Sequence, residues 1–110
     1  MIENRKFVVE GTADNYPFVL PCSREPAPGM TLTLTLINLQ DDALFVRVLQ
    51  SANGTDWQEL GLTQMRGLGI DIWPVSPSPG RKVRFVFWTT RGGRALVQFQ
   101  AFERRRSASA

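Results

Sequence analysis

The residue types that carry most enzyme chemistry are scarce in this chain. It has no histidine and a single cysteine, Cys22. Zinc sites of Cys and His, Ser-His-Asp triads and Cys-His nucleophiles therefore lack their parts, and no intrachain disulfide can form. The adjacent carboxylates Asp41 and Asp42 could hold a divalent cation or act as acid and base. We interpret them as a solvated turn instead, and expect no catalytic residue, no cofactor and no bound metal.

The three tryptophans are the next candidates, because exposed aromatic rings stack on sugars, on bases or on a protein partner. Trp57 is predicted to enter the core. Trp88 lies in phase with Arg84 along a strand, so Trp88 should face solvent if Arg84 does. Trp73, beside Pro74 in an irregular segment, is either an exposed contact residue or part of simple loop packing.

Basic residues gather late in the chain. Eight of the thirteen Lys and Arg residues follow residue 80, together with only one of the ten acidic residues. Such a group suits contact with phosphate or with an acidic protein surface, although it could equally solvate a hairpin and a tail. Its members are Arg81, Lys82, Arg84, Arg91, Arg94, Arg104, Arg105 and Arg106.

The chain has the size and composition of one folded domain. Its 110 residues are 43% hydrophobic and 21% charged, which is typical of globular proteins and sufficient for one core. No apolar run approaches the roughly 20 residues of a transmembrane helix, and the N-terminal stretch lacks the apolar segment of a signal peptide. We therefore expect cytoplasmic synthesis, residence in the cytoplasm or in a virion, and no membrane partner.

Alternating side-chain patterns predict β-strands. Residues 30–37 read Met-Thr-Leu-Thr-Leu-Thr-Leu-Ile, so one face of this strand should be buried and the other wet. Residues 43–51 form a more apolar strand, which we expect to be central. A hairpin at Asn53-Gly54 should join it to a returning strand at residues 57–62.

Four further strands are expected. Residues 82–89 and 94–102 are predicted to pair as a hairpin around Arg91-Gly92-Gly93, where the glycines can take positive φ. Shorter strands are expected at residues 6–10 and 16–20. Since no apolar period of 3.6 residues persists, we predict little or no helix.

The segment from residue 63 to residue 80 is predicted to be a long surface connection, because it holds prolines at positions 74, 77 and 79. Its apolar side chains could form an exchanged or docking segment, or simply a loop that covers the sandwich edge. These side chains are Leu68, Ile70, Ile72 and Trp73.

Short strands separated by turns indicate an all-β fold. We predict a single antiparallel β-sandwich, similar to a jelly roll, with about 7–8 strands. The domain should cover residues 1–103. Residues 104–110 should form a basic tail rich in Ser and Ala.

The stretch from Val48 to Trp57, Val-Leu-Gln-Ser-Ala-Asn-Gly-Thr-Asp-Trp, resembles the Ser-x-Asn-Gly-x-x-Trp hairpin of discoidin-like β-sandwich domains. It is also similar to small β-sandwich proteins encoded in phage and prophage structural regions. Discoidin-like lectins commonly carry a disulfide that joins their ends, which this chain cannot form, whereas the phage proteins are poor in Cys and about this size. The resemblance implies a capsid-decorating, head-completion or fibre-associated role.

We therefore expect a non-enzymatic structural or assembly protein, a virion accessory subunit that docks on a larger protein assembly and forms a homo-oligomer. One alternative is a carbohydrate-binding module that uses Trp73 and Trp88 as stacking platforms. Another is a single-stranded nucleic-acid-binding protein that uses the basic part of the chain. The predicted contact residues are Trp73, Trp88, Ile70, Ile72, Arg84, Arg91, Arg94, Arg104, Arg105 and Arg106.

Overall fold

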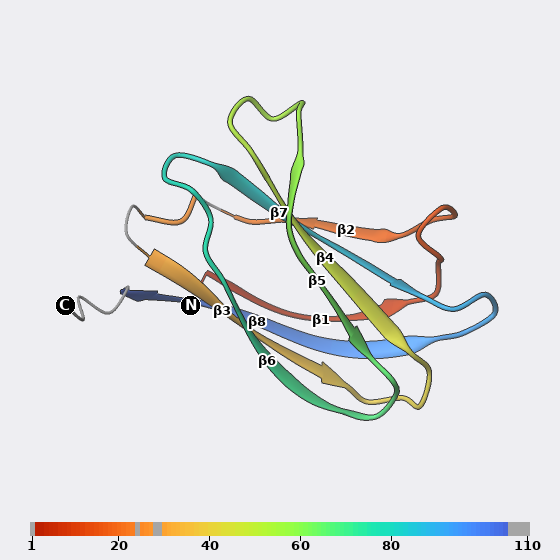
Figure 1. Cartoon of the computed structure of the whole chain (residues 1–110). Coiled ribbons are helices and arrows are strands. Elements are labelled where there is room, and N and C mark those ends of the chain that lie inside the picture. Colours follow the sequence, from red (N-terminus) through yellow and green to blue (C-terminus); the bar gives the residue numbers. More distant parts are fainter. Residues whose placement is uncertain (1, 24, 28–29, 106–110) are drawn as a thin grey trace.

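The structure is a computed structural model that describes residues 2–23, 25–27 and 30–105. Within these residues the chain forms eight strands and no helix (Figure 1). The strands are β1 (Glu3–Val9), β2 (Phe18–Pro21), β3 (Met30–Asn38), β4 (Leu44–Ser51), β5 (Gln58–Met65), β6 (Gly69–Val75), β7 (Lys82–Thr89) and β8 (Ala95–Arg105). The predicted all-β class and strand number are confirmed.

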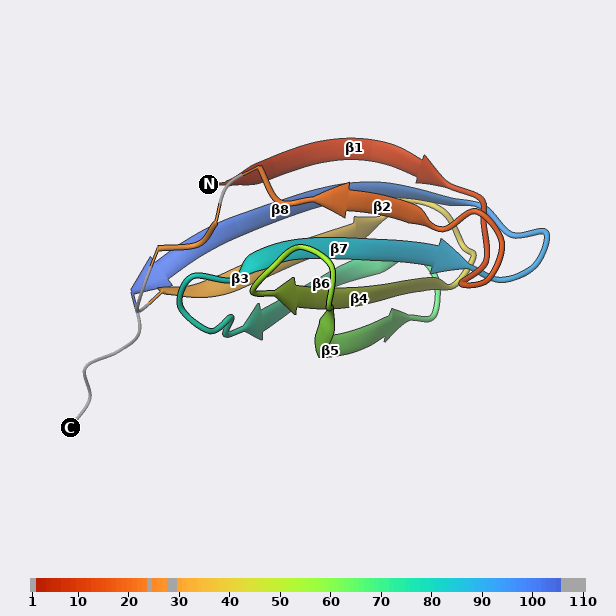
Figure 2. The same ribbon diagram turned by 90° about the horizontal axis from the view of Figure 1, so that it is seen from above.

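The strands form two antiparallel sheets that pack face to face (Figure 2). Their orders are β1-β8-β3-β6 and β2-β7-β4-β5. Every connection between consecutive strands crosses from one sheet to the other, except the link from β4 to β5. This is the strand order of a jelly roll, so the predicted architecture is confirmed.

The core lies between the sheets and follows from the alternation of side chains along each strand. Leu32, Leu34 and Leu36 on β3 are completely buried, and each contributes about 1.5–3 kcal/mol by leaving water. Phe85 of β7 meets Phe99 of β8 edge to face across the sandwich, with ring centroids 4.8 Å apart. The register expected for β3 is therefore confirmed.

The hairpin expected between residues 82–89 and 94–102 is wrong. The corresponding strands, β7 and β8, lie in different sheets, and the turn at residues 90–94 connects the two layers. β7 pairs with β2 and β4, whereas β8 pairs with β1 and β3. Both strands place alternate apolar residues in the shared core. Two strands show this pattern whether they are neighbours in one sheet or pack across the core from different sheets, so the pattern alone could not predict the pairing.

The long surface connection expected from residue 63 to residue 80 is also wrong for most of its length. β5 continues to Met65, and β6 pairs with β3 at the edge of its sheet. Pro74 is tolerated in β6 because an edge strand does not need every N–H for the ladder. The loop interpretation holds for residues 76–81, which carry no strand.

Candidate interaction surface

Of the two adjacent carboxylates, that of Asp42 stabilises a loop. The main-chain N–H of Arg94 donates to Asp42 Oδ2 at 2.8 Å, and Asn38 Nδ2 donates to the Asp42 carbonyl at 2.7 Å. Asp42 thereby ties the turn after β3 to the turn before β8, as a structural turn residue would. In the described part of the chain, no group of three or more His, Cys, Asp or Glu residues is placed to hold a metal ion. Nor do these residues include a helix that could cross a membrane.

The outer face of the sheet β2-β7-β4-β5 carries a group of aromatic and cationic side chains. On β7, Val83, Phe85 and Phe87 point into the core, so Arg84, Val86 and Trp88 point outward. On β4 the same alternation turns Phe45, Arg47 and Leu49 outward. We call these six outward residues the aromatic–arginine face.

The strand register arranges this face in rows. Trp88 lies directly opposite Phe45, Val86 opposite Arg47, and Arg84 opposite Leu49. Side chains that are directly opposite in an antiparallel pair have Cβ atoms about 4.5–5.5 Å apart, so they contact each other. The face is therefore one continuous surface across the two central strands of its sheet.

Trp88 is half-buried in this surface. Its ring is parallel to that of Phe45, with centroids 5.6 Å apart, and the Arg47 guanidinium lies 5.1 Å from the Trp88 centroid. The expectation that Trp88 shares its side with Arg84 and faces away from the core is confirmed. Phe45 and Arg47 were not predicted as contact residues, although the alternation from Leu44 to Ser51 is a signal that indicates their outward direction.

Trp57 is not a core residue, contrary to prediction. The loop before it is shaped by Asn53, whose Oδ1 accepts hydrogen bonds from the N–H groups of Thr55 and Asp56, both at 2.9 Å. Gly54 takes φ 81°, a conformation that favours glycine. This six-residue loop, longer than a tight turn, delivers the ring to the outer face, where the Arg84 guanidinium lies 4.2 Å from its centroid. The hairpin itself is confirmed, because β4 pairs with β5.

A hollow of about 370 Å³ adjoins Trp57. Cys22, Glu25 and Lys82 line it together with the indole ring. The hollow lies beside the end of the aromatic–arginine face that Arg84 occupies. It offers space for one inserted side chain of a partner.

The charge of the aromatic–arginine face is positive. Arg47 Nε lies 2.7 Å from Glu59 Oε1, and both side chains are partly exposed. Arg84 has no carboxylate partner among the residues that the structure describes. The face therefore combines apolar area with one uncompensated cation.

Trp73 and the isoleucines of β6 point to opposite sides of their strand. Trp73 faces inward and packs against the core, and its Cζ2 atom would lie only 2.5 Å from a Cβ built on Gly61. Neither expectation for Trp73 is correct. It is not an exposed contact residue, and it packs at the sandwich edge from strand β6 and not from a loop. Ile70 and Ile72 face outward and are 67% and 65% exposed.

The remaining predicted arginines do not converge. Arg91 and Arg94 follow β7, whereas Arg104 and Arg105 end β8, about 35 Å away at roughly 3.4 Å per residue. Pairing of Met30 with Arg105 extends the strand two residues beyond the expected domain boundary. Arg106 and the rest of the predicted tail lie outside the described residues.

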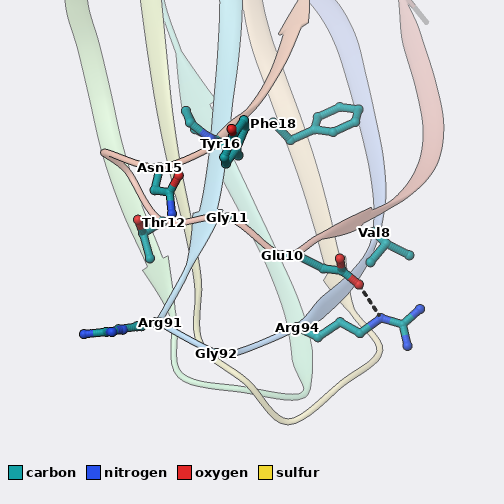
Figure 3. Close-up of a pocket in the computed structure, with 11 residues that line it drawn as sticks. Val8, Glu10, Gly11, Thr12, Asn15, Tyr16, Phe18, Arg91, Gly92 and Arg94 are labelled. Carbon is teal, nitrogen blue, oxygen red and sulfur yellow. Dashed lines mark ion pairs between the residues drawn. The ribbon is translucent and has the colours of Figure 1, made fainter.

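A second hollow, of about 620 Å³, lies at the Arg91 end (Figure 3). In it, Arg94 Nε pairs with Glu10 Oε1 at 3.3 Å, while Arg91 extends away from that pair. Tyr16 stands at the rim with φ 58° and 87% exposure. Tyr16 was not predicted as a site residue, because a tyrosine gives no sequence signal of a positive φ.

Fold and surface together define a jelly-roll β-sandwich with an aromatic–arginine face on one sheet. Comparisons with protein-family models, with curated proteins and with solved structures give no match to this chain.

Proposed function

We propose that the protein is a non-enzymatic binding subunit that docks on a larger protein assembly through the aromatic–arginine face. A virion accessory role, such as capsid decoration or attachment to a head or fibre, is the form of this function that the hairpin resemblance favours. The observation that carries the proposal is the pairing of arginines with tryptophans on an open sheet face, Arg84 on Trp57 and Arg47 on Trp88.

This pairing is suited to a protein partner. Trp and Arg are the residues that most often dominate binding energy at protein interfaces, particularly where they are packed against one another and shielded from water. Here both tryptophans are already half-buried, and each is held by a neighbouring guanidinium. Such preorganised side chains lose little conformational entropy when a partner covers them.

The charge predicts the chemistry of the partner. Arg84 has no carboxylate partner in the described chain, so a carboxylate on the partner could complete a desolvated ion pair. The hollow beside Trp57 would accept a single side chain next to that contact. We therefore infer a partner surface with an acidic residue within an apolar area.

The same arrangement weighs against sugar binding. Sugars stack on the open faces of aromatic rings, but guanidinium groups lie over Trp57 and Trp88, and Trp73 faces the core. Single-stranded nucleic acid is the second candidate, since bases stack on aromatic rings and phosphates pair with arginine. The cationic surplus of the face favours this alternative over a carbohydrate.

The test is gradient sedimentation of the native source lysate, with mass-spectrometric detection of the chain and of variants expressed in the same cells. The wild type should migrate in fixed ratio with a large protein particle. Arg84→Glu and Trp88→Ala should leave the particle and migrate near the 12.4 kDa of the monomer or as a small oligomer. Lys6→Glu is the matched control, because Lys6 is an exposed cation on β1 of the other sheet.

Migration of the wild type near the top of the gradient would contradict docking on a particle. Nuclease treatment separates the second candidate, since a nucleic-acid complex would dissolve and a protein particle would remain. Anisotropy with a labelled single-stranded oligonucleotide gives an independent measure. Nucleic-acid binding must weaken steeply between low and physiological salt, because phosphate contacts release counterions.

A further inference from the structure

Sheet edges differ in how this fold protects them. An edge strand presents unpaired main-chain groups that can pair with another chain, and proteins block such edges with inward charges, short strands, prolines or bulges. β1 carries Glu3 and Arg5 on its core-facing side, opposite Ala101 and Phe99. β2 has only four residues and ends at Pro21. These two edges are protected.

The other two edge strands, β5 and β6, lie beside each other and differ in how well they are protected. β5 is interrupted by a bulge opposite Val48 and Leu49 and exposes Gln58, Glu59 and Gln64. β6 instead exposes Ile70 and Ile72, and it holds no charged side chain on its outward face. The features of β6 that oppose pairing are Pro74, near the end of the strand, and the inward carboxylate of Asp71, which accepts a hydrogen bond from Thr63 Oγ1 at 3.2 Å.

The position of Pro74 reveals which main-chain groups of β6 are open. Pro74 has no N–H, yet it lies opposite Thr33 in a ladder without register shifts. In an antiparallel pair, residues alternate between those that bond the opposite strand and those that point away. Pro74 must be of the second kind, and so must Ile72 and Ile70. Their N–H and C=O groups therefore point to the open edge, where β6 has no neighbouring strand in the described chain.

We propose that this edge pairs with the same edge of a second copy of the chain. With a two-fold axis through Asp71, Ile70 of one copy faces Ile72 of the other in a hydrogen-bonded pair. Each of the two pairs exchanges two N–H to C=O bonds, which gives four in all. The four isoleucine side chains meet on one face of the joined sheet.

Self-complementarity is the reason to assign a second copy to this edge. The two-fold axis matches donor to acceptor at both isoleucines, and it places each exposed apolar side chain beside another. Pro74 then falls opposite Leu68, outside the four bonds. On β3, Thr35 and Ile37 lie directly opposite Ile72 and Ile70. Both are uncharged, so they do not repel a second copy of the chain. Two Asp71 carboxylates lie opposite each other near the axis, so the association should be weak enough to be reversible.

Pairing in this way has a consequence for docking, although the pairing itself does not depend on the proposed function. A two-fold axis along the normal of the sheet β1-β8-β3-β6 leaves both aromatic–arginine faces on the same side of the dimer. A dimer that engages one assembly through both faces should bind more tightly than a monomer, because the first contact holds the second face at a high effective concentration.

The experiment is sedimentation velocity of the full chain from micromolar to near-millimolar concentration. The wild type should pass from monomer to dimer. Ile72→Pro removes one open N–H per copy, hence two of the four bonds, while Pro74 shows that the strand tolerates proline at a position of this kind. It should weaken dimerisation at least about tenfold, as should Ile72→Lys. Leu62→Lys, on the neighbouring edge strand β5 and 51% exposed, should have no effect.

A second measurement tests the register. In a Cys22→Ser background, Asp71→Cys places two thiols at the axis, where opposite Cα atoms are about 4.5 Å apart and can form a disulfide. It should give a covalent dimer in air, whereas Ile72→Cys should not.

A wild type that stays monomeric, or a dimer unchanged by both Ile72 variants, would overturn the pairing. Neither result bears on docking, whose variants lie on the other sheet. Far-UV circular dichroism verifies that each variant is folded.

Discussion

The guanidinium of Arg84 lies 4.2 Å from the centre of the Trp57 ring, on the outer face of the sheet β2-β7-β4-β5. Arg84 lies on β7, whereas Trp57 is the last residue of the six-residue loop between β4 and β5. An arginine held in this way is worth about 0.5–1 kcal/mol where it is exposed and more when a partner excludes water. This contact is thus a modest contribution to folding and a larger one to binding.

Removal of the Trp57 ring should therefore destabilise the fold only slightly. Trp57→Ala should lower the free energy of unfolding by about 1–2 kcal/mol, since the ring is half-buried and outside the core. Phe99→Ala, which empties a fully buried site, should cost about 3–5 kcal/mol. Urea denaturation measures both. Equal losses would place Trp57 in the core after all.

Gly61 should not tolerate a side chain, because a Cβ there would lie 2.5 Å from Trp73 Cζ2. Gly61→Ala should cost about 1–3 kcal/mol through displacement of the indole. In a Trp73→Leu background the same change should cost much less, because the smaller side chain leaves room. A double-mutant cycle by thermal or urea unfolding measures the coupling. Additive losses would show that the two residues do not contact.

Asn38, the last residue of β3, should be essential for the stability of the turn that follows this strand. It is almost completely buried, its Nδ2 donates to the carbonyls of Asp42 and Gly67, and its Oδ1 accepts from the Gln40 N–H. Asn38→Ala leaves these groups unpaired and should cost about 1–3 kcal/mol. Asn4→Ala, at an exposed position of β1, should stay within about 0.5 kcal/mol of the wild type. The prediction fails if the two variants unfold alike.

Tyr16 should be a site where glycine stabilises the protein. It adopts φ 58° while its side chain is 87% exposed. The left-handed conformation destabilises the folded state, and the exposed ring adds little packing energy to offset this. Tyr16→Gly should raise the free energy of unfolding by about 0.5–1 kcal/mol. Val19→Gly, in the regular strand β2, should lower it by about 1 kcal/mol. A loss of stability for Tyr16→Gly would show that the tyrosine ring makes a stabilising contact.

Features that depend on neighbouring residues in the sequence were predictable. The alternation of Leu and Thr identified the buried face of β3, and Asn53-Gly54 identified the one connection in the described chain between consecutive strands that pair. These are local signals, because the period of a strand and the φ preference of glycine act within a few residues. The outward direction of Trp88 followed from the same alternation.

Features that depend on which strands become neighbours were not predictable. The sequence of β7 and β8 predicts a hairpin, but in the jelly roll these strands belong to different sheets. Trp57 was predicted to enter the core with the other large apolar rings, but the length of its loop places it on the outer face. The aromatic–arginine face joins β4 to β7, and no pattern within either strand indicates that pairing. Topology, not side-chain preference, assembles this candidate site.

The order of the strands also has a kinetic consequence. Of the six pairings in the described chain, that of β4 with β5 alone joins consecutive strands. Pairings between distant strands form slowly, because a long loop must close before any contact stabilises it. Among the described strands β1 pairs only with β8, so during synthesis β1 stays unpaired until β8 has been made. Until β8 has left the ribosome, the nascent chain exposes β1 as an unpaired, partly apolar segment. Rapid synthesis or a chaperone should then be needed to prevent aggregation through β1.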